Sequence, residues 1–91
     1  MPTKEGILSW LLEAKTNGAS HVVVVCDTFD YEDYPVEVLP DEDVHAVVAK
    51  NNNPDHMSNV MEVYWLDGDI DAQLAMPSSF TYGPAEPGSQ D

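Results

Sequence analysis

Apolar residues recur at helical spacing near the start of the chain and then form one continuous run. Over residues 3–17 the apolar positions fall three or four apart, Thr3 can cap the first turn, and Gly18 follows the last. This pattern predicts an amphipathic helix. Residues 20–26 contain four consecutive valines. Because β-branched residues favour strands, this unbroken run predicts a strand that is buried on both faces.

A polar and aromatic segment separates this strand from the next predicted element. We expect residues 27–34 to form a loop, because they are too rich in carboxylates to be core. Residues 36–39 alternate between apolar and polar and predict a second strand. Asp41 then has the chemistry of a helix cap, and the apolar spacing that follows predicts a short second helix ending near Lys50.

The remaining pattern predicts one more strand and one more helix. Residues 59–66 are mostly apolar and read as a third strand, and a short helix is expected from Ile70 until Pro77 stops it. The predicted order, α-β-β-α-β-α, indicates an α+β fold: a small three-stranded, mainly antiparallel sheet with helices packed on one face. We expect residues 1–77 to form a single domain and the Pro- and Gly-rich residues 78–91 to be a flexible, disordered tail.

The charge balance bears on partners more than on fold. The chain has 17 Asp and Glu against three Lys and no Arg, a formal net charge of −14, and no Lys or Arg stands between Thr16 and Ala49. Because three lysines cannot neutralise enough phosphates of DNA or RNA, we expect no direct nucleic-acid binding. The longest apolar run is too short to span a membrane. A single cysteine, Cys26, excludes an internal disulfide and favours a reducing cytoplasm.

Residues 27–34, Asp-Thr-Phe-Asp-Tyr-Glu-Asp-Tyr, combine carboxylates with aromatic rings directly after the buried strand. Loops that follow strands often carry function, and three interpretations stay open here. Asp27 and Asp30 could hold Mg²⁺ for catalysis. The carboxylates could instead cap turns while Phe29 or Tyr34 packs beneath them. In the third interpretation the segment binds a basic partner, because rings supply contact area and carboxylates supply charge.

No other motif predicts catalysis or a cofactor. The Asp-Gly-Asp-Ile-Asp sequence that begins at Asp67 imitates a calcium loop, but the sixth and twelfth positions of such a loop would be Ala72 and Ser78, where Gly and Glu are needed. Helix capping by Asp67 or Asp69 is the favoured interpretation. The three histidines match no zinc spacing. We therefore expect no metal, no cofactor and no enzymatic activity.

Two stretches of the chain resemble a known group of proteins. VVVVCDTFDYEDYPVEVLPDEDV (residues 22–44) and NVMEVYWLDGDIDAQLA (residues 59–75) are similar to a family of short acidic proteins encoded by tailed phages and prophages. The resemblance carries no established activity, and so it assigns no catalytic residue. It implies a phage context, in which small acidic proteins bind and disable host nucleases, CRISPR or restriction components, or transcription factors.

Charge and resemblance together predict a noncatalytic protein that binds a basic host protein in the cytoplasm of a bacterium and inhibits or modulates it by DNA mimicry. Carboxylates on a rigid surface imitate the phosphates that such partners grip. The alternative is a structural or assembly accessory that forms a homodimer through an edge strand or the Trp10 face and is acidic only for solubility. The expected binding residues are Asp27, Asp30, Tyr31, Glu32, Asp33, Tyr34, Asp41, Glu42 and Asp43.

Overall fold

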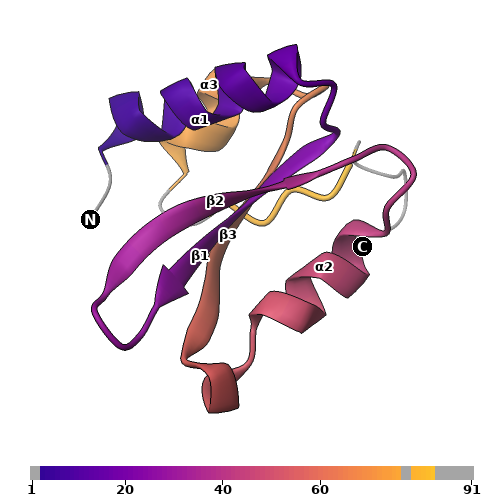
Figure 1. Cartoon of the computed structure of the whole chain (residues 1–91). Coiled ribbons are helices and arrows are strands. Elements are labelled where there is room, and N and C mark those ends of the chain that lie inside the picture. Colours follow the sequence, from indigo (N-terminus) through magenta and orange to yellow (C-terminus); the bar gives the residue numbers. More distant parts are fainter. Residues whose placement is uncertain (1–2, 77–78, 84–91) are drawn as a thin grey trace, which may run out of the picture.

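The computed structural model describes residues 3–76 and 79–83. Within them the three strands form one antiparallel sheet in the order β2-β1-β3 (Figure 1). The predicted α+β class and element order are confirmed. The elements are α1 (Lys4–Thr16), β1 (His21–Asp27), β2 (Glu32–Val38), α2 (Val44–Asn51), the 3-10 turn η1 (Pro54–His56), β3 (Ser58–Trp65) and α3 (Ile70–Ala75).

Short polar side chains set the helix starts. The Thr3 hydroxyl accepts a hydrogen bond from the Gly6 N–H at the start of α1 (3.0 Å), as its sequence position predicts. The predicted cap of α2 is wrong by two residues, because Asp43 and not Asp41 occupies that position. The Glu42 carboxylate accepts from the Leu39 N–H, and the Glu42 N–H donates to the Leu39 carbonyl. This turn delays the start of the helix.

Helices cover both faces of the sheet, and the expectation that they share one face is wrong. Val22 and Val24 of β1 pack in one core with residues of α1 and α3, whereas Val23 and Val25 pack in a second core with residues of α2. In Figure 1, α1 and α3 accordingly lie on the opposite side of the sheet from α2. The four-valine run requires this arrangement, since alternate strand residues point to opposite faces and both sets are apolar.

Half of the segment expected to be a loop is strand. The register pairs Asp27 with Glu32, Cys26 with Asp33, and Val25 with Tyr34, so only residues 28–31 form the turn of a β-hairpin. A strand this polar is compatible with the sheet because β2 is an edge strand, where carboxylates and proline face solvent and discourage pairing with another chain.

The domain extends past the predicted boundary at residue 77. Ser79 is fully buried, and residues 79–81 lie parallel to β3, with the Val63 N–H donating to the Ser79 carbonyl (2.6 Å) and the Thr81 N–H donating to the Val63 carbonyl (3.0 Å). The Tyr82 ring packs against the core under α2. Because the segment is hydrogen-bonded to β3 and buries Ser79 and part of Tyr82, residues 79–83 belong to the domain. The rest of the expected tail, residues 78 and 84–91, lies outside the described residues.

Candidate functional site

The β1-β2 hairpin carries most of the residues that the sequence marked for binding. We define the hairpin surface as the set made by the hairpin and the residue beside its tip: Asp27, Phe29, Asp30, Tyr31, Glu32, Asp33, Tyr34 and Met57. The Thr28 N–H donates to the Met57 carbonyl (2.8 Å), which ties the start of β3 to the hairpin tip. Figure 1 shows this tip at the end of the sheet that also holds η1.

Backbone hydrogen bonds to carboxylates shape the hairpin turn. Asp27 Oδ1 accepts from the Phe29 N–H (2.8 Å), and Asp30 Oδ1 accepts from the Glu32 N–H (3.1 Å). The interpretation that these carboxylates cap turns is therefore confirmed for both residues. Its second part is wrong for Phe29, because 76% of that residue is exposed and its ring does not pack beneath the turn.

The hairpin tip holds large apolar side chains in an unfavourable backbone conformation. Tyr31 (φ 59°) and Met57 (φ 55°) are the non-glycine residues with positive φ in the described chain. This left-handed region costs a bulky residue about 1 kcal/mol or more, and asparagine or glycine would fit it better. Yet Tyr31 is 74% exposed and Met57 49% exposed. Tyr31 thus keeps most of its surface in water despite that cost.

The acidic hairpin affects the thiol of Cys26, which pairs with Asp33 across β1 and β2. Burial raises the pKa of the Cys26 thiol, and a side-chain hydrogen bond with Asp33 and the negative charges of Asp33, Asp27 and Asp30 raise it further. A thiol with a raised pKa stays protonated near neutral pH and is a poor nucleophile. The base of the hairpin therefore carries no activated cysteine.

The structure separates Asp41, Glu42 and Asp43 from the hairpin surface. They follow the other end of β2, a seven-residue strand whose two ends lie about 20 Å apart at roughly 3.3 Å per residue. Two of the three carboxylates already serve the local fold, Glu42 in the turn at Leu39 and Asp43 as the cap of α2. The expected binding residues thus form two groups, and only the hairpin group combines charge with exposed rings.

Metal chemistry receives no geometric support from the described residues. Within residues 3–76 and 79–83 no three His, Cys, Asp or Glu side chains gather as metal ligands would. Asp69 caps α3, with Oδ1 accepting from the Ala72 N–H (3.1 Å), which confirms the capping interpretation of this motif. No helix in the same residues is both long and apolar enough to cross a bilayer.

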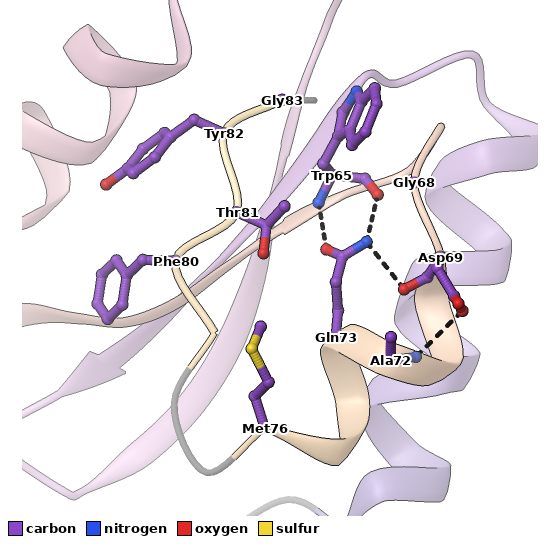
Figure 2. Close-up of a pocket in the computed structure, with 10 residues that line it drawn as sticks. All are labelled: Trp65, Gly68, Asp69, Ala72, Gln73, Met76, Phe80, Thr81, Tyr82 and Gly83. Atoms are coloured by element: carbon purple, nitrogen blue, oxygen red, sulfur yellow. Dashed lines mark hydrogen bonds between the residues drawn. The ribbon is translucent and has the colours of Figure 1, made fainter. Parts of the chain in front are cut away.

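A second surface feature, which the sequence did not reveal, lies at the end of β3 that is farther from the hairpin surface. An open groove of about 390 Å³ runs between α3, the end of β3 and residues 80–83. Figure 2 shows its central residue, Gln73, between Trp65 and Met76, with the Thr81 side chain pointing toward it. The rings of Phe80 and Tyr82 point away on the other side of their segment.

Gln73 closes the floor of this groove. It is only 4% exposed, its Oε1 accepts from the Trp65 N–H (2.8 Å), and its Nε2 donates to the carbonyls of Trp65 (2.9 Å) and Asp69 (3.2 Å). A side chain on Gly68 would clash here, since a Cβ would lie 2.5 Å from Trp65 Cε3. One feature of the sequence could have indicated that Gln73 is buried: it stands between Ile70 and Leu74, on the apolar face of a short helix.

Two histidines hold the wall formed by residues 80–83. His21 Nε2 donates to the Tyr82 carbonyl (2.6 Å), and the His45 ring stacks on the Tyr82 ring with centroids 4.3 Å apart. Because His21 begins β1 and His45 belongs to α2, the wall is joined to two elements of the core. The groove is therefore formed before any ligand arrives.

Comparison with protein-family models, with curated proteins and with solved structures finds no match to this chain. The assignment of the two surfaces rests on their chemistry.

Proposed function

We infer that this chain is a noncatalytic, acidic phage-type protein that binds a basic host protein through the hairpin surface and inhibits or modulates it. The class of partner that fits best handles nucleic acid: a nuclease, a CRISPR or restriction component, or a transcription factor. Such proteins carry cationic surfaces that grip phosphates, and a rigid set of carboxylates can occupy the same surface as a DNA mimic.

The exposed Tyr31 is the observation that carries the proposal. A tyrosine in the left-handed region with 74% of its surface in water costs folding free energy and contributes little to the core. Phe29 is exposed beside it, and Asp27, Asp30 and Glu32 flank both rings. Exposed rings surrounded by charge are typical of the anchors of protein interfaces.

Electrostatics supports a basic partner for the same surface. With a net charge of −14 and no Lys or Arg in the hairpin, the protein attracts cationic surfaces over several Å and repels acidic ones. The same charge opposes the alternative, a homodimer, because two copies repel each other. Glu32, Pro35 and Glu37 along the β2 edge also discourage pairing with a second copy.

The experiment is capture from bacterial lysate at low and at high salt, comparing the unmodified chain with two variants. Tyr31→Asn removes the ring and keeps a residue that tolerates positive φ. The second variant reverses charge at Asp30, Glu32 and Asp33. The proposal predicts one basic, nucleic-acid-handling protein that is released by salt and lost with both variants. Unchanged capture by both variants would refute it, and recovery of the chain alone, with a concentration-dependent mass, would favour the homodimer.

A further inference from the structure

We propose that the groove beside Gln73 receives an arginine side chain of the basic partner, with its aliphatic stem along the groove and its guanidinium at Asp69. This inference rests on the proposed function for the class of partner. It adds a second contact point, at the end of the sheet opposite the hairpin surface.

The groove selects an apolar stem. Trp65, Ala72 and Met76 line it, and Met76 is 42% exposed although it is large and apolar. The floor offers no free donor, because both Nε2 hydrogen bonds of Gln73 go to backbone carbonyls. A polar group placed over Gln73 would therefore lose water without gaining a hydrogen bond from the floor.

The rim selects a cation. Asp69 lines the groove, and the sequence places Asp67 and Asp71 beside it, whereas none of the three lysines lines the groove. Asp69 Oδ1 is bound to the Ala72 N–H, and within the described residues the second oxygen has no hydrogen bond. An arginine side chain fits both the apolar groove and its acidic rim, since it joins an apolar stem to a planar cation that stacks on aromatic rings and binds carboxylates.

A fixed wall favours binding of a small group. Since His21 and His45 hold Tyr82 in place, little conformational entropy is lost when a side chain enters. The open shape and the volume of about 390 Å³ suit one long side chain of a partner better than an enclosed small molecule.

The test is a titration of the full chain with a capped peptide that contains one arginine between glycines, followed by amide NMR shifts. The matched peptide has citrulline, which has the same shape without the charge. The expected result is that the arginine peptide shifts the amides of Gly68, Asp69 and Ala72 and that the citrulline peptide does not. Asp69→Asn keeps a helix cap and should weaken binding about three- to fivefold.

Two tryptophan variants on one helix separate groove binding from general attraction. Ala72→Trp fills the groove and should abolish the shifts, whereas Ala75→Trp, on an exposed position outside the groove, should leave them unchanged. Shifts spread over all acidic residues, or unaffected by Ala72→Trp, would overturn the inference. Failure of this inference can be told apart from failure of the proposed function. If only the groove inference is wrong, the hairpin variants still abolish partner capture, whereas Ala72→Trp captures the partner as well as the unmodified chain does.

Discussion

Replacing Gln73 by methionine keeps the volume of the side chain and removes all three of its hydrogen bonds. The carbonyl of Trp65 retains a bond from the Gly68 N–H (3.2 Å), and the carbonyl of Asp69 retains one from the backbone N–H of residue 73 (3.1 Å). The Trp65 N–H loses its partner, Oε1 at 2.8 Å. An unsatisfied donor in a partly buried site, with two lost bonds to carbonyls, amounts to about 2–3 kcal/mol.

That loss is a large part of the stability of about 5–15 kcal/mol that is usual for a domain. For a chain of this size it should lower Tm by roughly 10–20 °C. Urea unfolding followed by far-UV circular dichroism measures the free energy of unfolding. The control is Ala75→Met, which places the same side chain on an exposed position of α3 and should change stability by less than about 0.5 kcal/mol. Equal stability of the two variants would refute the role assigned to Gln73.

Three further predictions concern single residues. Gly68→Ala should destabilise the fold by about 1–3 kcal/mol in urea unfolding, because its Cβ would lie 2.5 Å from Trp65 Cε3. Burial and a hydrogen bond to a carboxylate raise the pKa of Tyr64, so the folded state holds this proton more tightly than the unfolded state does. The free energy of unfolding should therefore fall as pH rises above about 10. Tyrosinate absorbance should show one tyrosine that does not ionise until the protein unfolds. Asp33→Asn should speed alkylation of Cys26 at constant pH, because Asp33 helps to raise the pKa of the thiol.

The sequence predicted the parts of the fold that depend on local pattern. The valine run gave β1, Thr3 gave the start of α1, and Asp69 gave the start of α3, since strand propensity and helix capping act over a few residues. The same valine run also implied cover on both faces of the sheet. The expectation of helices on one face missed that implication.

Long-range pairing could not be predicted from the pattern. The start of β2 at Glu32 depends on its register with β1, which places a polar edge strand where composition predicted a loop. Residues 79–83 look like tail by composition and join the domain through β3, His21 and His45. The hairpin residues of the candidate site were identified from sequence, because charge and rings are visible there. The sequence alone did not identify the exposed Phe29 ring, the place of Met57 beside the hairpin or the groove, because each depends on how distant segments pack in the fold.

Affinity for the captured partner, measured with matched charge-reversal variants, tests most directly whether the hairpin surface binds a basic protein. One variant carries Lys at positions 30, 32 and 33. The control carries Lys in place of Glu5, Glu13 and Glu37, three exposed acids outside both the hairpin surface and the groove, and so has the same net charge. A local site predicts that the hairpin variant loses affinity by at least about tenfold more than the control, since anchors and adjacent charges dominate an interface. Equal losses in both variants would show that only net charge matters and would contradict the account.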